Sequence, residues 1–183
     1  MKTDLYSFLL QRLTDVRKLV ILGVGSELMQ DDAAGVAVTQ NLIKKYGEDN
    51  AGFRIISAYT NPENFTRTIC DYNPDHIVII DAADLTTQPG TVKYIPVEAI
   101  NDLTVGTHKI SLIMMIEYLR KVINCEFTVI AIQYKSVGFN CRMTREVQSG
   151  VRQITGLLSD IINDRFHKNN PPSFFSSEGA ERK

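Results

Sequence analysis

Four polar residues in this sequence are of types and spacing that could carry chemistry: Asp31, Asp32, Asp81 and His108. Two carboxylates and an imidazole form a mixed oxygen and nitrogen set, which suits a borderline divalent ion such as nickel or zinc. Three protein ligands would leave coordination positions for water or for groups that a partner brings. The sequence therefore predicts a metal-contacting site, provided that the fold brings Asp32, Asp81 and His108 together.

The elements expected next to these residues are dense in aliphatic side chains. The run Lys18 to Val24 (KLVILGV) ends in a glycine turn and indicates a buried strand, and the acidic pair follows a few residues later. The run His76 to Asp81 (HIVIID) is aliphatic until its last residue and indicates a second such strand. His108 lies in the loop before a strongly apolar helix expected at Ile110 to Ile123.

The remaining expected elements alternate between strands and amphipathic helices. They are a helix over 4–14, a helix from Ala33 to Tyr46 closed by Gly47, a strand from Phe53 to Tyr59, a short helix opened by Pro62, an edge strand from Thr91 to Val97, a strand from Phe127 to Ile132 and a last helix from about Met143.

This alternation predicts an α/β fold: a single-domain, doubly wound, three-layer sandwich with a mainly parallel five-stranded sheet flanked by helices. Sites in such folds lie beyond the carboxyl ends of the strands, at the switch point of the sheet. If the first and third strands are neighbours, in a 2-1-3 order, Asp32 and Asp81 can converge on one crevice and His108 can close it.

Each candidate residue also has a structural interpretation. Asp32 precedes a helix, where aspartate is a common N-cap. Asp81 could bond loop amides at the end of its strand, and His108 could be structural or exposed to solvent. His76 opens a strand and His167 falls in the expected tail, so both are weaker candidates.

Other catalytic templates fit the sequence less well. The turn Gly23-Val24-Gly25 lacks the third glycine of a dinucleotide fingerprint, and the acidic pair would repel a pyrophosphate. The sequence has no GxSxG, Walker or HExxH motif. A Cys–His nucleophile made of Cys141 and His108 stays open as an alternative.

Composition narrows the class of partner. The chain has 183 residues, 44% hydrophobic and 22% charged, with a formal net charge of -1. That balance gives no bulk attraction to nucleic acid or to an anionic membrane, so we expect a partner recognised by a specific surface. The three cysteines are widely spaced and the N-terminus has no apolar signal run, so we expect a cytoplasmic protein with reduced thiols and no membrane span.

One domain accounts for most of the chain. We expect it to cover residues 1–166, with the 4–14 helix as an N-terminal addition. Residues 167–183 (HKNNPPSFFSSEGAERK) are polar, contain a Pro-Pro pair and show no periodicity, which predicts a mobile C-terminal tail.

Several motifs together resemble one known family. GVGSELMQDDAAGV, PEN at Pro62 to Asn64, HIVIIDAAD, QPGTVKYI, GTHKISL and SVGFNCRMT are similar, in order and spacing, to the nickel–iron hydrogenase maturation endopeptidases, and most of all to the hydrogenase-3 (formate-hydrogenlyase) type. The resemblance spans about Lys18 to Ile162.

The resemblance implies a doubly wound fold and an endopeptidase that removes the C-terminal extension of the nickel-loaded hydrogenase large-subunit precursor. It implies that nickel carried by the substrate is sensed, without a tightly bound cofactor of the enzyme's own. We also expect the protein to be a monomer. Matched motif by motif, the nickel-contacting and catalytic residues fall on Asp32, Asp81 and His108, and Asp31 matches a supporting aspartate.

Two positions depart from the family pattern. Ser26 replaces the usual asparagine after the glycine turn, and Ala58-Tyr59 replaces paired glycines that the family links with substrate recognition. Two other functions remain alternatives: a metal-independent carboxylate-dyad hydrolase using Asp32 and Asp81, and a nickel-binding chaperone or adaptor without peptidase activity. Which group activates the water, nickel or a carboxylate, stays open at this point.

Overall fold

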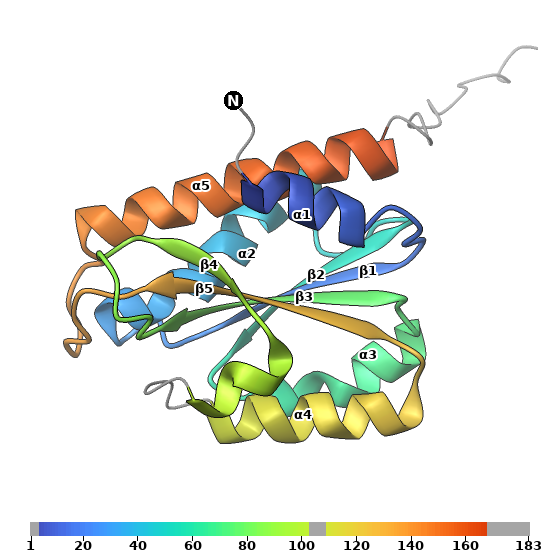
Figure 1. Cartoon of the computed structure of the whole chain (residues 1–183), viewed down its shortest axis with the longest axis horizontal. Coiled ribbons are helices and arrows are strands. Elements are labelled where there is room, and N and C mark those ends of the chain that lie inside the picture. Colours follow the sequence, from blue (N-terminus) through green and yellow to red (C-terminus); the bar gives the residue numbers. More distant parts are fainter. Residues whose placement is uncertain (1–3, 103–108, 168–183) are drawn as a thin grey trace, which may run out of the picture.

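The fold is a five-stranded sheet covered by helices on both faces (Figure 1). The computed structural model describes residues 4–102 and 109–167. Its strands are β1 (Leu19–Val24), β2 (Phe53–Tyr59), β3 (His76–Ala83), β4 (Val92–Ile95) and β5 (Glu126–Gln133). Its helices are α1 (Asp4–Arg12), α2 (Ala34–Tyr46), α3 (Thr66–Tyr72), α4 (Lys109–Val122) and α5 (Arg145–Ile162), with short helical turns at η1 (Gln30–Ala33), η2 (Pro62–Phe65), η3 (Val97–Asp102) and η4 (Asn163–His167).

The strand order is β2-β1-β3-β5-β4. The pairs β1–β2, β1–β3 and β3–β5 are parallel, and β4 runs antiparallel to β5 at one edge. The expected α/β fold and the 2-1-3 neighbourhood of the first three strands are therefore confirmed. β1 and β3 lie side by side, so the loops that follow them leave the sheet at the same edge.

Two apolar cores lie on opposite faces of the sheet. On one face, alternate residues of β1 such as Leu19 and Ile21 pack with α1, α2 and α5; on the other, Val20 and Leu22 pack with α3 and α4. Every residue of β1 is buried, because both faces of a parallel sheet are covered in this arrangement. Figure 1 shows the two helical layers, with α5, α1 and α2 above the sheet and α3 and α4 below it.

Most expected boundaries hold within two residues, with a few corrections. β3 does not end at Asp81 but continues to Ala83, because β5 pairs with it as far as Ala83↔Gln133. The last helix begins at Arg145 rather than near Met143, the edge strand β4 is shorter than expected, and the N-terminal helix ends at Arg12 rather than at residue 14.

The expected tail lies outside the described residues except for His167, which ends η4. Among residues 4–102 and 109–167, no helix combines the length and the apolar character needed to cross a bilayer.

Candidate active site

The two candidate aspartates lie at the border between β1 and β3. The ladder between these strands ends with the pair Gly23↔Ile80, so Asp81 is the first residue of β3 beyond it. Asp32 lies in η1, which connects β1 to α2 and packs against β3. Both side chains are largely buried, each with 8% of its surface exposed. The fold therefore brings Asp32 and Asp81 to the same edge of the sheet.

Gly35 explains how η1 comes so close to the strand ends. A Cβ atom at this position would collide with the carbonyl oxygens of Val24 in β1 and Ile80 in β3. Only glycine allows the start of α2 to rest directly on both strands. That contact fixes Asp32, three residues earlier, above the border between β1 and β3.

The carboxylate of Asp32 holds the loop that follows β1. Its Oδ2 accepts a hydrogen bond of 2.7 Å from the backbone N–H of Ser26. The N-cap of α2 is Ala33, and no side chain caps that helix. The capping interpretation of Asp32 is therefore wrong, because η1 separates this residue from the α-helix.

Asp81 has a local backbone partner. Its Oδ1 accepts a hydrogen bond of 2.8 Å from the backbone N–H of Ala82, the next residue along β3. This bond holds one oxygen of the carboxyl group next to the backbone of β3, just beyond the end of the ladder with β1. Sites in such folds lie at this carboxyl edge of the sheet.

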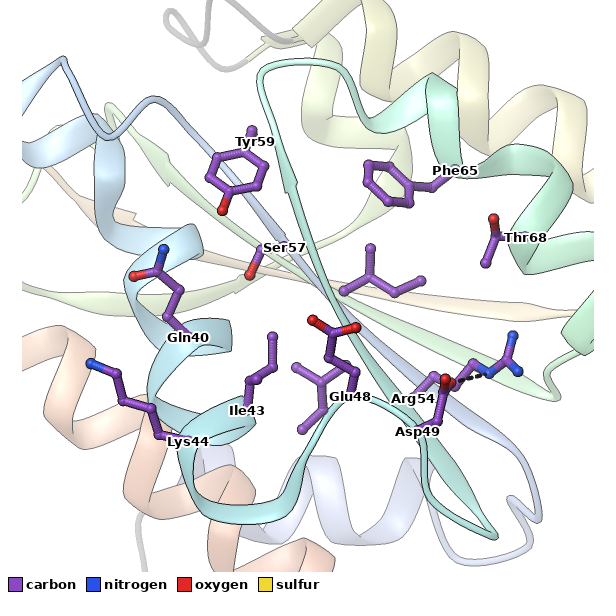
Figure 2. A pocket seen from close by; sticks show the side chains of 12 residues that line it. Gln40, Ile43, Lys44, Glu48, Asp49, Arg54, Ser57, Tyr59, Phe65 and Thr68 are labelled. Atoms are coloured by element: carbon purple, nitrogen blue, oxygen red, sulfur yellow. Dashed lines mark ion pairs between the residues drawn. The ribbon is translucent and has the colours of Figure 1, made fainter.

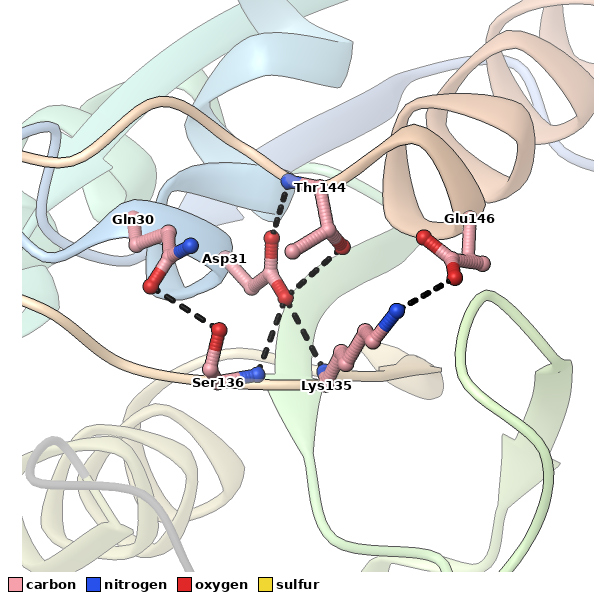
Figure 3. A network of polar contacts seen from close by, with 6 residues as sticks. All are labelled: Gln30, Asp31, Lys135, Ser136, Thr144 and Glu146. Carbon is pink, nitrogen blue, oxygen red and sulfur yellow. Dashed lines mark hydrogen bonds and ion pairs between the residues drawn. The ribbon is translucent and has the colours of Figure 1, made fainter.

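Asp31, adjacent to Asp32 in η1, is completely buried and serves as an anchor for another loop (Figure 3). It accepts hydrogen bonds from the backbone N–H groups of Lys135, Ser136 and Thr144 at 3.0, 3.1 and 2.7 Å, and from the Thr144 hydroxyl at 2.9 Å. A buried carboxylate needs such partners to offset its desolvation. The contacts tie the loop between β5 and α5 to η1.

Gln30 adds to the same connection. Its Oε1 accepts from the Ser136 hydroxyl and from the Gly138 N–H, both at 2.9 Å, and its backbone adopts a positive φ of 47°. A further bond joins the Asn140 N–H to the Leu28 carbonyl at 2.6 Å. The roles of Gln30, Ser136 and Thr144 were not predicted from the sequence. The one signal for them was that they belong to the family-like motifs GVGSELMQDDAAGV and SVGFNCRMT.

The two connected loops expose apolar side chains beside the acidic pair. Leu28, Val137 and Phe139 have 56%, 45% and 72% of their surfaces exposed, respectively. We call these three residues the apolar rim. Exposed apolar groups gathered beside a site are typical of surfaces that contact another macromolecule.

The two remaining candidates are the histidines His108 and His76. His108 lies outside the described residues, so its meeting with Asp32 and Asp81 stays a prediction. Over the described ranges, no group of three or more His, Cys, Asp or Glu side chains is arranged to hold a metal ion. His76, at the amino end of β3, is 2% exposed and bonded to Thr128 at 2.8 Å.

The cysteines differ in their environment. All three thiols are free, with Cys141 exposed and Cys70 and Cys125 half-buried. Burial raises the pKa of the Cys125 thiol to about 12, which suppresses its thiolate form. Cys141 donates to the Phe139 carbonyl at 3.4 Å, so it is the accessible thiol near the apolar rim.

Known proteins similar to this chain share one description. Residues 36–161 match the sequence model of a family described as hydrogenase maturation protease. A protein of Methanocaldococcus jannaschii, provisionally described as a hydrogenase maturation protease, is 35% identical over 161 residues, covering 85% of this chain and 95% of the relative. The hydrogenase 3 maturation protease of Escherichia coli K12 is 29% identical over 136 residues, covering 74% and 85%.

Solved structures agree with these sequence matches. The crystal structure of a [NiFe] hydrogenase maturation protease, HycI from Thermococcus kodakarensis KOD1, superposes with a TM-score of 0.76 at 22% identity, covering 85% of this chain and 99% of that one, which shows a shared fold. The solution structure of the endopeptidase HycI from Escherichia coli gives a TM-score of 0.66 at 26% identity, covering 76% and 87%.

Proposed function

This chain belongs to the hydrogenase maturation protease family, whose members are peptide-bond hydrolases, and we propose that it removes the C-terminal extension of a nickel-loaded hydrogenase large-subunit precursor. This proposal rests on the position of Asp32 and Asp81 at one border of the sheet, next to Asp31, which holds the loop between β5 and α5. In the proposal, Asp32, Asp81 and His108 contact nickel that the substrate carries. The enzyme is of the aspartyl type and holds no tightly bound cofactor of its own.

The described geometry supports a hydrolytic role for the aspartates. Two carboxylates at one border of the sheet offer oxygen ligands to a divalent ion that a substrate brings. A precursor without that ion would lack this contact, and discrimination between the loaded and the empty precursor would follow. Asp81 keeps one carboxyl oxygen on the backbone N–H of Ala82, which holds the group in place.

The reaction itself is a hydrolysis of one amide. Water adds through its oxygen to the scissile carbonyl carbon, the carbon–nitrogen bond breaks, and a proton moves to the departing amine. A carboxylate that accepts a proton from the water could return it to that amine. Nickel of the substrate, if it polarises the carbonyl, would lower the barrier further.

The substrate of this reaction is proposed to be another protein. The apolar rim of Leu28, Val137 and Phe139 supports this choice, because it offers an exposed contact surface beside the aspartates. We further propose a monomeric, cytoplasmic protein that uses neither nucleic acid nor membrane as a partner. Its free thiols and near-neutral charge are compatible with that setting.

One experiment separates this function from its alternatives. Nickel-loaded and nickel-free precursors are incubated with the wild type, with Asp81→Ala and with His108→Ala, and the mass of each product is measured. Trimming of the loaded precursor alone, lost in both variants, is the expected result. Equal trimming of both precursors would favour a metal-independent carboxylate dyad, and nickel uptake without any change in precursor mass would favour a chaperone.

A further inference from the structure

The outer edge of β2 bounds a groove of about 660 Å³ that the proposed chemistry does not use (Figure 2). β2 pairs with β1 on one side and, among the described residues, has no strand on its other side. Figure 2 shows Ile43 and Lys44 of α2 on one side of β2, with Phe65 and Thr68 near α3 on the other. The groove thus lies over the free edge of the sheet, between helices of both layers.

The amino-terminal half of this edge is already covered by the chain itself. The Ile55 N–H donates to the Glu48 carbonyl at 2.9 Å, and the Phe53 carbonyl accepts from the Asn50 N–H at 3.0 Å. Both groups point away from β1. Because the backbone groups of alternate residues in a strand point to the same side, the N–H and C=O of Ser57 point outward as well.

One end of the groove, at Tyr59, lies next to the loop that follows β1. Tyr59, 42% exposed, stands at its upper end in Figure 2, and its carbonyl accepts from the Gly25 N–H at 2.9 Å. Ser26, the residue after Gly25, donates its N–H to the Asp32 carboxylate. A chain lying along β2 would therefore arrive with one end at the loop that holds Asp32.

We propose that this groove binds an extended segment of the protein substrate, next to its scissile bond, as an added strand on β2. The inference rests on the proposed function and identifies the surface along which the substrate peptide would bind as it approaches Asp32. The part of the edge that the chain leaves uncovered runs from the Ile55 carbonyl to Ser57, because the Ile55 N–H already bonds to Glu48 and Tyr59 turns away with a φ of 53°. These three residues span about 10 Å at 3.3 Å per residue, which accommodates about three extended residues.

An extended peptide suits this groove better than other ligands. Strand addition draws its affinity from main-chain hydrogen bonds to an open edge, and its selectivity from side-chain pockets on alternate sides. Here the edge supplies the Ser57 backbone groups, α2 supplies one wall and η2 with α3 the other. The walls carry charges of both signs, Lys44 and Glu48, which gives no preference for a polyanion.

The first test blocks the groove without disturbing the core. Thr68→Trp places a large side chain in it from an exposed position of α3, and Arg67→Trp places the same side chain on the neighbouring exposed residue that does not line it. With nickel-loaded precursor, Thr68→Trp is expected to raise KM by about tenfold and to leave kcat within about twofold, whereas Arg67→Trp behaves as the wild type.

The second test removes one backbone donor. Ser57→Pro and Ser57→Ala both lose the hydroxyl that bonds to Thr39 at 2.8 Å, but only proline also loses the N–H that points into the groove. Proline is tolerated on an edge strand where the N–H faces outward. The proline variant is expected to raise KM by about fivefold or more relative to the alanine variant.

The proposed function and the proposed peptide groove can be disproved separately. If the wild type trims no loaded precursor, the proposed function falls, and this inference falls with it. If the wild type trims the precursor, and Thr68→Trp and Ser57→Pro match their controls in KM, the inference alone is overturned. A wild-type dimer that Thr68→Trp converts to a monomer would also overturn it, because the edge would then belong to a second copy.

Discussion

Asp31 and Thr144, separated by 113 positions in the sequence, are joined by two hydrogen bonds. Oδ1 of Asp31 accepts from the Thr144 backbone N–H at 2.7 Å, and Oδ2 accepts from the Thr144 hydroxyl at 2.9 Å. Thr144 is also the N-cap residue of α5, yet its side chain makes no capping bond. The Thr144 hydroxyl thus binds Asp31 of the candidate site instead of capping the helix that follows it.

Replacing Asp31 should destabilise the whole domain. Asp31→Asn substitutes an NH₂ group for one oxygen, and that group cannot accept from the Lys135, Ser136 and Thr144 donors. We expect the free energy of unfolding to fall by about 2–4 kcal/mol, measured by urea denaturation, since buried donors lose a charged acceptor. Asp160→Asn, exposed on α5, should cost less than about 0.5 kcal/mol. A loss below about 1 kcal/mol for Asp31→Asn would contradict the anchoring role.

Neutralising either candidate aspartate should affect chemistry more than folding. In Asp32→Asn and Asp81→Asn the amide oxygen can still accept from the Ser26 and Ala82 N–H groups, so the fold is retained. We expect kcat/KM for nickel-loaded precursor to drop by about 100-fold or more in each variant. Glu27→Gln, an exposed carboxylate on the same loop, serves as the matched control. Near-wild-type trimming by either aspartate variant would remove that residue from the site.

Stability should fall in mild acid because of His76. Burial, with a smaller contribution from the positive charge of Arg12, lowers the pKa of His76 to about 4 from 6.5. In the unfolded chain this histidine binds a proton below about pH 6.5, whereas in the folded protein it stays neutral down to about pH 4. The free energy of unfolding therefore decreases as the pH falls from 6.5 to 4. We expect His76 alone to remove about 2 kcal/mol of unfolding free energy between pH 7.5 and pH 5.

The comparison variant for this pH effect is His76→Gln. Glutamine does not titrate, so the slope of unfolding free energy against pH should be shallower in the variant across the same range. Denaturant titrations at pH 7.5, 6 and 5 provide the measurement. Parallel slopes for the two proteins would show that the imidazole is not the group responsible.

The apolar rim should matter for substrate affinity and little for folding. Phe139 is 72% exposed, so Phe139→Ala should change the free energy of unfolding by less than about 0.5 kcal/mol. We expect the same variant to raise KM for the precursor by about tenfold. Val122→Ala, at the carboxyl end of α4 and 51% exposed, is the apolar control. If both variants change KM equally, the rim has no special place in docking.

A cysteine nucleophile would reveal itself at Cys141. This thiol is exposed, whereas the raised pKa of Cys125 makes that residue unreactive at neutral pH. Under the proposed aspartate chemistry, Cys141→Ser should trim loaded precursor at a rate within about twofold of the wild type. A loss of several orders of magnitude, with the fold intact, would instead favour the pairing of Cys141 with His108.

Local patterns in the sequence determined the elements and the layer order of this protein. The strand at Phe53–Tyr59 is found with the predicted bounds, because its apolar run and its flanking turns act within a few residues. Gly47 ends α2 as predicted, since a positive φ of 82° there suits glycine. The same alternation of strands and helices predicted a parallel sheet and placed Asp32 and Asp81 at its carboxyl edge.

The tertiary structure alone decided what each residue of the acidic pair does. Both aspartates precede a helix in the sequence, but burial and long-range partners make Asp31 the anchor of the loop after β5 and leave Asp32 on the loop after β1. β3 likewise extends to Ala83 because its neighbour β5 supplies pairing partners that far. Asp31 and Ser136 are 105 positions apart, and β3 and β5 are likewise distant in the sequence, so no local window of sequence contains both partners.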